Sequence, residues 1–167
     1  MIAHEKADAK KEIIVPNIIV KVPEGAFDPA ACDRLGKAIT AAAKKVEQIG
    51  DDPRQEFTIW VAVEEIRAGH LFAGGHDPLS RVLPVIVMFY VPAGVIDSGG
   101  RAEAVRLIQA AVAAAKSEAD PRVVMTSVIV TEVPDGTWGA GGALWRLDDF
   151  VRAAGYKHLQ PAAAHSA

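Results

Sequence analysis

Hydrophobic residues in the first part of the chain follow two periods, one typical of a β-strand and one typical of an amphipathic helix. Residues 17–22 are rich in β-branched side chains and stop at a Pro-Glu-Gly turn, which predicts a strand. Asp28 and Pro29 form the pattern of a helix N-cap followed by proline in the first turn, and Gly50 is placed to end this helix. Between these limits hydrophobic residues recur every three or four positions, at Leu35, Ile39, Ala42, Val46 and Ile49. We expect a second strand over residues 57–63.

The second half of the chain repeats this order of elements. A strand is expected over residues 84–91, a helix from Asp97 and Ser98, and a last strand over residues 123–133. The landmarks of the first half recur 67 to 69 positions later: Pro16 as Pro84, Val22-Pro23-x-Gly25 as Val91-Pro92-x-Gly94, Asp52-Pro53-Arg54 as Asp120-Pro121-Arg122, and Ala73-Gly74-Gly75 as Ala140-Gly141-Gly142. Because these landmarks keep one order at nearly one spacing, we infer that the chain contains two copies of one strand-helix-strand unit.

A helix that joins two strands places them side by side and parallel. Two such units predict an α+β fold with a four-stranded mixed sheet and two helices on one face. The strands are apolar on both faces, as the run from Val85 to Tyr90 shows. The face without helices needs a cover, and little of the chain is left to supply it apart from a short helix through Leu147, Phe150 and Val151. We therefore expect a homo-oligomer that packs sheet against sheet.

The length of the chain predicts a single domain over residues 1–167. Its expected parts are an N-terminal extension over 1–15, a first unit over 16–75, a second unit over 83–142, and a C-terminal helix and tail over 143–167. The first residues mix acidic and basic side chains without an apolar segment, so we expect no signal peptide.

Composition excludes several classes of function. The formal net charge is −3, so no basic field attracts nucleic acid, and no apolar run reaches the roughly 20 residues that span a membrane. The single cysteine, Cys32, excludes an internal disulfide and a cysteine-rich metal site, and it favours a cytoplasmic location. His70 and His76 match no zinc-site spacing, so we expect neither a metal nor a cofactor. The glycines between Gly139 and Gly142 lack the rest of a dinucleotide-binding motif and predict a turn.

One known family combines these landmarks. The residues that carry the resemblance are Pro16 to Val22 with Glu24 and Gly25, then Val63-Glu64-Glu65-Ile66 with Gly69, His70, Gly74 and Gly75, and in the second half Val130-Thr131-Glu132-Val133 with Gly136 to Gly142. They resemble the 4-oxalocrotonate tautomerase pattern over about residues 16–145. Two such units in one chain resemble the fused tautomerases, which include the cis-3-chloroacrylic acid dehalogenases and the malonate semialdehyde decarboxylases. The resemblance implies a β-α-β unit and a homotrimer with inward-facing sheets.

The resemblance also implies a catalytic proline. In the family, the free amine of an N-terminal proline acts as general base or acid toward small 2-oxo and enol acids, and its counterpart here is Pro16. Fifteen residues precede Pro16 in this sequence, so its nitrogen is an amide that takes no proton. Val15 stands directly before it, and a GTG codon read there as a start would expose Pro16 after removal of methionine. Against this, residues 12–15 are strand-like and suit a genuine extension of the first strand.

The arginines with which the family holds a substrate carboxylate are missing. Their positions hold Ala26 and Val95 after the first turn of each unit, and Trp60 and Ser127 in the second strand of each unit. The aromatic pocket wall is kept as Trp138, where the first unit has Leu71. The resemblance therefore implies Trp138 and Trp60 as candidate substrate-binding residues, with Arg67 or an arginine of a neighbouring subunit as a replacement anchor. The alternative is a purely structural role for these residues. Each tryptophan would then be a core or interface aromatic, and Arg67 would be a surface charge.

Two functions remain open. The first is an oligomeric tautomerase-like protein that lacks proline-dependent catalysis and has a binding or structural role, including that of an inactive partner in a mixed oligomer. The second is an isomerase, hydratase or decarboxylase that acts on a small 2-oxo or unsaturated acid, with Pro16 exposed as its base. The sequence does not decide whether the protein is an enzyme.

Overall fold

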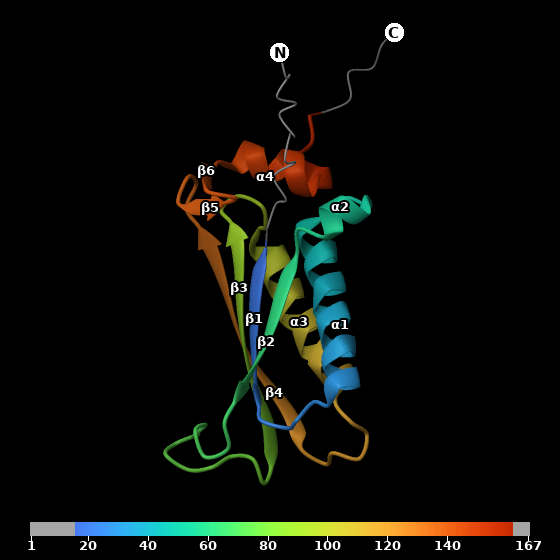
Figure 1. The fold of residues 1–167 in the computed structure, drawn as a ribbon, viewed down its shortest axis with the longest axis vertical. Coiled ribbons are helices and arrows are strands. Elements are labelled where there is room, and N and C mark those ends of the chain that lie inside the picture. The colour runs from blue at the N-terminus through green and yellow to red at the C-terminus, as the bar shows by residue number, and fades with distance from the viewer. Residues whose placement is uncertain (1–15, 162–167) are drawn as a thin grey trace, which may run out of the picture.

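The structure is a computed structural model that describes residues 16–161. Its elements in chain order (Figure 1) are β1 (Asn17–Pro23), α1 (Pro29–Glu47), α2 (Pro53–Glu56), β2 (Trp60–Ile66), β3 (Val82–Pro92), α3 (Ser98–Ala115), β4 (Val123–Val133), β5 (Trp138–Ala140), β6 (Ala143–Trp145), α4 (Leu147–Ala154) and the 3-10 turn η1 (Lys157–Leu159). The expected N-terminal extension, including Val15, lies outside the described residues.

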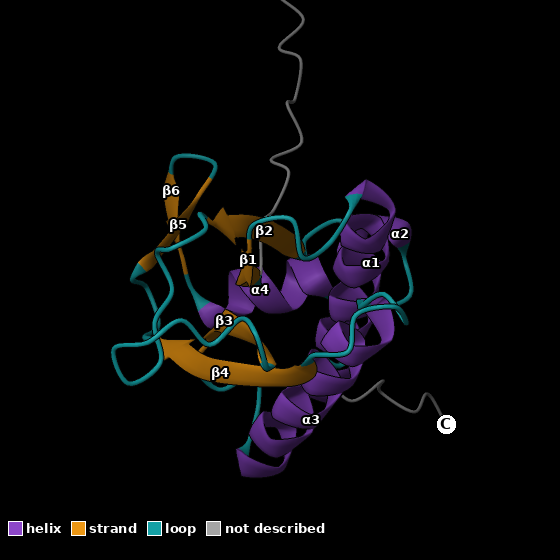
Figure 2. Ribbon diagram, turned by 90° about the horizontal axis from the view of Figure 1, so that it is seen from below, coloured by secondary structure: helices purple, strands orange, loops and turns teal. Residues whose placement is uncertain are grey.

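The main sheet has four strands in the order β2-β1-β3-β4. β1 is parallel to β2, and β3 is parallel to β4, as expected for two strands joined by one helix. The two units meet through an antiparallel pairing of β1 with β3, in which Ile19 lies beside Met88. Figure 2 shows α1 and α3 on the same side of this sheet. The predicted α+β fold, a mixed four-stranded sheet with two helices on one face, is therefore confirmed.

Local chemistry explains where the first helices begin and end. The side chain of Asp28 accepts a hydrogen bond from the backbone N–H of Ala31, so it caps α1 as predicted. α1 ends at Glu47, because the next residue, Gln48, takes a left-handed conformation with φ of 55°. Gln48 thus takes the terminating role that the sequence pattern assigned to Gly50, two residues further along the chain.

The prediction of a strand over residues 57–63 is wrong at its start. Asp52 and Gln55 form a capping box around Pro53, and this arrangement stabilises the short helix α2. Phe57 is the C-cap of that helix, so β2 begins at Trp60. The apolar run continues from the end of a helix into a strand, and a hydrophobic pattern alone does not separate the two.

The two faces of the sheet differ in burial. The face toward the helices is fully buried along β1 and β3, where Val20 and Val87 have no exposed surface. The opposite face carries large apolar side chains that remain exposed, including Trp60, Val123, Met125 and Ile129, between 47% and 65% exposed. This bare face, as we call it, was expected from the apolar character of both faces of the strands.

The C-terminal elements lie at one end of the sheet rather than on its bare face (Figure 1). β5 and β6 form an antiparallel hairpin after β4, and α4 follows it. Phe150 of α4 is buried and lies against Trp145, with ring centroids 5.3 Å apart. The predicted terminal helix is therefore present, and it leaves the bare face uncovered.

Between residues 16 and 161, no helix is both long enough and apolar enough to cross a membrane.

Candidate functional site

Pro16 and Trp60 lie side by side at the end of the sheet where β1 and β2 begin. The backbone N–H of Trp60 donates to the carbonyl oxygen of Pro16 at 2.9 Å. Pro16 is buried, whereas the Trp60 side chain points out of the bare face with 47% of its surface exposed. Two of the candidate residues are thus brought together by the parallel pairing of β1 with β2.

Trp138 lies at the same end of the sheet. β4 runs parallel to β3, and β3 runs antiparallel to β1, so β4 ends where β1 begins. Trp138 then pairs with Trp145 in the β5–β6 hairpin, and the edge of its ring meets Phe150 at a centroid distance of 5.7 Å. The ring is half-buried and is held by packing against α4.

Arg67 lies at the opposite end of the sheet from these three residues. It follows Ile66, the last residue of β2, which lies beside Pro23 at the end of β1. At about 3.3 Å per residue, β2 puts roughly 20 Å between Arg67 and Trp60. An Arg67 that serves Pro16 therefore has to come from another subunit.

A cavity of about 510 Å³ borders the start of β1 and β2. Its lining residues are Asn17, Ile18, Ile19, Ile59, Trp60, Val61 and Ala62. None of these described lining residues carries a charge, so the cavity presents apolar side chains and strand backbone. It suits an apolar group better than an isolated carboxylate, which needs a cationic or N–H partner when it leaves water.

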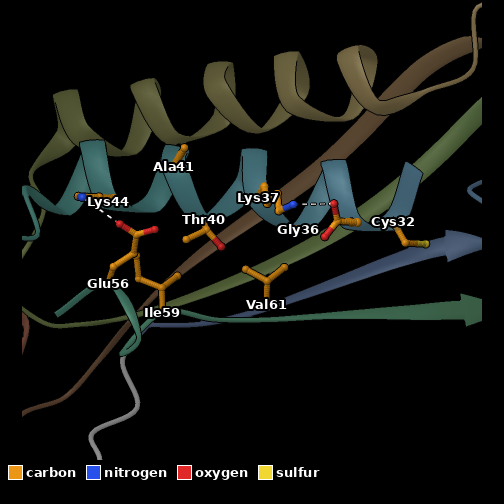
Figure 3. Close-up of a pocket in the computed structure, with 10 residues that line it drawn as sticks. Cys32, Gly36, Lys37, Thr40, Ala41, Lys44, Glu56, Ile59 and Val61 are labelled. Carbon is orange, nitrogen blue, oxygen red and sulfur yellow. Dashed lines mark hydrogen bonds and ion pairs between the residues drawn. The ribbon is translucent and has the colours of Figure 1, made fainter. Parts of the chain in front are cut away.

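A second groove, of about 580 Å³, lies between α1 and β2 (Figure 3). Its cations are already paired: Lys37 Nζ donates to Asp33 at 2.7 Å, and Lys44 Nζ donates to Glu56 at 2.9 Å. Cys32 lies at the end of this groove in the first turn of α1, where the sequence pattern predicted it. The groove therefore offers a mixed surface without a free cluster of one charge among the residues that line it.

Arg54, which lies in α2 shortly before β2 begins, is also paired with a carboxylate. The guanidinium of Arg54 donates to both carboxylate oxygens of Asp52, from Nη2 to Oδ2 at 2.6 Å and from Nε to Oδ1 at 3.1 Å. These hydrogen bonds lower the pKa of Asp52 to about 2, so the pair stays ionised at neutral pH. Arg122 makes the same fork with Asp120 in the second unit.

Ala26 and Val95 stand where the resemblance would place arginines, and both lie in the turn that ends a first strand. The backbone N–H of each residue closes its turn: that of Ala26 donates to the carbonyl of Pro23 at 3.1 Å, and that of Val95 donates to the carbonyl of Pro92 at 3.2 Å. Val95 is buried. The turns are therefore conserved in geometry between the two units and carry no cation.

Glu47 and Tyr156 are two buried ionisable residues that the sequence patterns did not single out. Both have no exposed surface. Glu47 is four residues after the buried Ala43 on α1, so the helical period does place it at the margin of the apolar stripe. Its burial depends on the C-terminal segment that contains Tyr156, which no local pattern connects to α1.

Metal ligands are not gathered in the part of the chain that the structure describes. Between residues 16 and 161 there is no group of three or more His, Cys, Asp or Glu side chains placed to hold an ion. His70 and His76 lie in the exposed segment between β2 and β3.

Comparison with known proteins gives a likeness of fold. No protein-family model matches the sequence, and no curated protein matches it. Among solved structures, a fused 4-OT protein described as a symmetric trimer is 20% identical, with 84% of this chain and 99% of that chain covered and a TM-score of 0.62. A member of the cis-3-chloroacrylic acid dehalogenase family is 15% identical, with 87% and 93% covered and a TM-score of 0.62.

A third solved structure, native RhCC from Rhodococcus jostii RHA1, is 18% identical, with 89% of this chain and 99% of that chain covered and a TM-score of 0.62. All three matches extend over most of both chains, so they include both strand-helix-strand units. The resemblance noted in the sequence is thereby confirmed at the level of fold: the chain is built like the fused, two-repeat tautomerases.

Proposed function

We propose that this protein is a self-associating member of the tautomerase-like fold that lacks proline-dependent catalysis in the chain as written. The observation that carries the proposal is the state of Pro16. Its nitrogen forms a peptide bond with Val15, its ring is buried, and its carbonyl is fixed in the sheet by Trp60. An amide nitrogen has no basic lone pair, so it neither accepts nor delivers the proton that the family's chemistry requires.

The bare face supports self-association. It carries large exposed apolar side chains on β2 and β4, and the gathering of such side chains on one face is typical of a surface that packs against another protein. The same region of the sheet also has one ion pair, between Lys21 on β1 and Glu64 on β2, and both of these side chains are partly exposed. Two solved structures with the same fold are described as trimers, one symmetric and one asymmetric. A homotrimer that buries the bare face is the assembly we propose.

The role of such a trimer is to bind a small apolar or weakly polar molecule near Pro16. The cavity of about 510 Å³ beside Trp60 is lined by uncharged residues, and cavities of this size and character accommodate small ligands. Trp138 lies at the same end, so it can form an aromatic wall for the cavity of its own or of a neighbouring subunit.

The second candidate function is catalysis of tautomerisation, hydration or decarboxylation of a small 2-oxo or unsaturated acid. The observation that favours it is the place of Pro16, directly before β1 and beside an exposed tryptophan. A chain that begins at Pro16 would have a free secondary amine at that position. Its substrate carboxylate would still need an anchor, for which Arg67 of another subunit is the candidate.

Two forms of the protein separate these functions. The full chain and a chain that begins at Pro16 after removal of the initiator methionine are assayed with phenylpyruvate and 2-hydroxymuconate. We expect no turnover by the full chain. If the full chain turns over a substrate and Pro16→Ala keeps that activity, the proline mechanism is contradicted. If Pro16→Ala abolishes the activity of the full chain, the proposal of a non-catalytic protein is contradicted.

The oligomeric state is measured on the same samples by light scattering. A single mass of three chains supports the trimer. Met125→Glu and Ile129→Glu place charges on the β4 edge of the bare face and are expected to give monomers. The matched change Glu118→Gln lies in an exposed turn away from that face and leaves the mass unchanged.

A further inference from the structure

Glu47 and Tyr156 are buried together where the C-terminal segment meets the end of α1. Neither side chain has exposed surface. Both carboxylate oxygens of Glu47 and the hydroxyl of Tyr156 lack a hydrogen-bond partner of normal geometry. Buried polar groups in native proteins are nearly always paired, so this arrangement calls for a physical explanation.

The contact around these two residues, which we call the C-terminal junction, joins residues 154–158 to residues 47–51. The backbone N–H of Gly50 donates to the carbonyl of Ala154 at 3.0 Å, and the backbone N–H of Lys157 donates to the carbonyl of Gln48 at 2.8 Å. The two bonds lie on either side of Tyr156 in the chain. They fix the phenol ring against the last turn of α1.

Among the residues that the structure describes, no cation is free to neutralise an ionised Glu47. The charged and titratable side chains that α1, the following loop, α3 and the C-terminal segment bring to this region have other partners: Lys44 binds Glu56 and Asp51, Lys45 binds Glu103, which also binds Arg106, Lys157 binds Asp51, and the ring of His158 bonds the carbonyl of Val95. The remaining neighbour is the uncharged phenol of Tyr156.

An isolated carboxylate is too costly to bury without a partner, so a buried carboxyl keeps its proton instead. Burial raises the pKa of Glu47 well above its ordinary value, and the hydroxyl of Tyr156 opposes only part of that rise. A protonated carboxyl is both donor and acceptor, as is a phenol hydroxyl, so each group can satisfy the other.

We propose that Glu47 and Tyr156 act as a proton-dependent latch, in which the neutral carboxylic acid of Glu47 pairs with the Tyr156 hydroxyl to hold the C-terminal junction closed and loss of its proton opens the junction. The device concerns the C-terminal segment and does not depend on whether Pro16 is catalytic.

The direction of the pH dependence follows from the raised pKa. The closed junction binds one more proton than the open one at any pH between the ordinary pKa of Glu47 and its raised value. The junction is therefore fully stabilised below the ordinary value of 4.5, and this stabilisation is lost as the pH rises. In this range the equilibrium constant for opening rises by up to about tenfold per pH unit.

The latch controls the covering of one end of the molecule. α4 leads into the junction and lies across the end of the sheet at which β1 and β2 begin (Figure 1). Opening of the junction frees the C-terminal end of α4, which is otherwise held to Gly50 through Ala154. Raising the pH is thereby expected to loosen the cover over the end that contains Pro16.

Hydrogen exchange of single amides in the full chain tests the latch. The amides of Gly50 and Lys157 report opening of the junction, and those of Val20 and Val87 in the buried strands report global unfolding. Protection factors, corrected for the intrinsic effect of pH on exchange, are measured from about pH 5 to about pH 8. We expect the protection of Gly50 and Lys157 to fall several-fold per pH unit while it stays below that of Val20 and Val87, because the junction opens without global unfolding.

Glu47→Gln removes the titratable proton of the carboxyl group and keeps the shape of the side chain. In this variant the protection of the Gly50 and Lys157 amides is expected to become independent of pH within about twofold. The matched control is Glu118→Gln, an exposed carboxyl that keeps the dependence of the unchanged chain. The proposal is overturned if the protection of Gly50 and Lys157 in the unchanged chain does not fall with pH, or if Glu47→Gln keeps the same slope.

Infrared spectroscopy keeps the test decisive if Glu47→Gln does not fold. The C=O stretch of a protonated carboxylic acid is separate from that of a carboxylate, and we expect it in the unchanged chain at neutral pH. Its absence there would refute the latch. Its disappearance at the pH at which the Gly50 and Lys157 amides lose protection would support it.

Discussion

The Ala-Gly-Gly motif forms the same backbone turn in both units but enters two different environments. Gly74 and Gly75 have φ of 58° and 83°, and Gly141 and Gly142 have φ of 56° and 81°. In the first unit this turn closes a single bridge between Ala73 and His76. In the second unit the same turn continues into the paired strands β5 and β6.

The residues next to the turns account for the difference. In the second unit Trp145 is buried, donates its indole N–H to the carbonyl of Ala140 at 3.1 Å, and packs on Phe150 of α4. In the first unit Phe72 is 64% exposed, and no helix follows the turn. A local motif therefore fixes the turn, and a distant element decides whether that turn becomes part of the core.

The grooves between helix and edge strand differ in a similar way. Gln109 of α3 donates to the carbonyl of Val124 at 3.3 Å and accepts from the Thr126 backbone and hydroxyl, at 3.2 and 2.7 Å. Its equivalent in α1, 69 residues earlier, is Thr40. Threonine is too short to make the same bridge, and the groove of about 580 Å³ remains between α1 and β2 (Figure 3).

The largest expected effect separates the two hairpins. Trp145→Ala removes a buried aromatic side chain and its hydrogen bond, and we expect it to lower the free energy of unfolding by about 3–5 kcal/mol. Phe72→Ala in the first unit is expected to change it by less than about 0.5 kcal/mol. Urea unfolding at one protein concentration measures both, and equal losses would show that the first hairpin is also part of the core.

The bridge from helix to edge strand gives the next effect. Gln109→Ala leaves the Thr126 N–H and the Val124 carbonyl without their partner, and we expect a loss of about 1–3 kcal/mol. Thr40→Ala at the equivalent place in the first unit is expected to cost less than about 0.5 kcal/mol. The same unfolding measurement checks both variants. A similar cost at the two sites would mean that Gln109 does not stabilise the edge of β4.

The turns themselves give a smaller effect. A Cβ added at Gly142 or Gly75 meets no atom within 4 Å, so the cost of alanine comes from the left-handed backbone alone. We expect Gly142→Ala to reduce the free energy of global unfolding by about 1 kcal/mol. Gly75→Ala is expected to cost less, because the first turn can open locally without loss of the core. Amide exchange at Ala143 and His76 distinguishes local from global opening.

The two Asp-Pro-Arg forks give the smallest effect, which is confined to acidic pH. Hydrogen bonds from Arg122 lower the pKa of Asp120 to about 2. A lowered pKa stabilises the fold above the ordinary value of 3.8, and that stabilisation is lost as the pH falls toward 2. Asp120→Asn is therefore expected to flatten the fall in stability between these values.

The equivalent change in the first unit serves as the control for the forks. Asp52 is more exposed than Asp120, with 36% against 13% of the side-chain surface accessible. Solvent screens the exposed pair more strongly, so Asp52→Asn is expected to flatten the acid limb less. Thermal unfolding at a series of acidic pH values measures the two slopes, and the reverse order would contradict the comparison.

Regular parts of the fold could be read from the sequence because their signals are local. The strand over residues 123–133 has the predicted bounds, and Asp28 and Asp97 cap the helices as predicted. The repeat identified the pairing of strands within each unit. The prediction failed at Phe57, where a capping box formed by Asp52 outweighs an apolar run.

The candidate site could be predicted only as residue types, because its geometry depends on how the two units are joined. The antiparallel contact between β1 and β3 puts Trp138 at the end with Pro16, and the parallel pairing of β2 puts Arg67 at the other end. Neither relation is encoded within one unit. The burial of Glu47 requires the C-terminal segment, more than a hundred residues away in the chain, and sequence periodicity carries no information about that contact.

The antiparallel contact at the centre of the sheet gives the molecule an approximate twofold axis perpendicular to the sheet, so a single chain is a covalent pseudo-dimer. Pro16 and Pro84 are related by this axis and lie toward opposite ends. Only one of these ends is crossed by α4. The helix therefore makes the two ends of an otherwise symmetric sheet different. In the trimer proposed above, the two ends of the sheet would therefore form two chemically distinct rims.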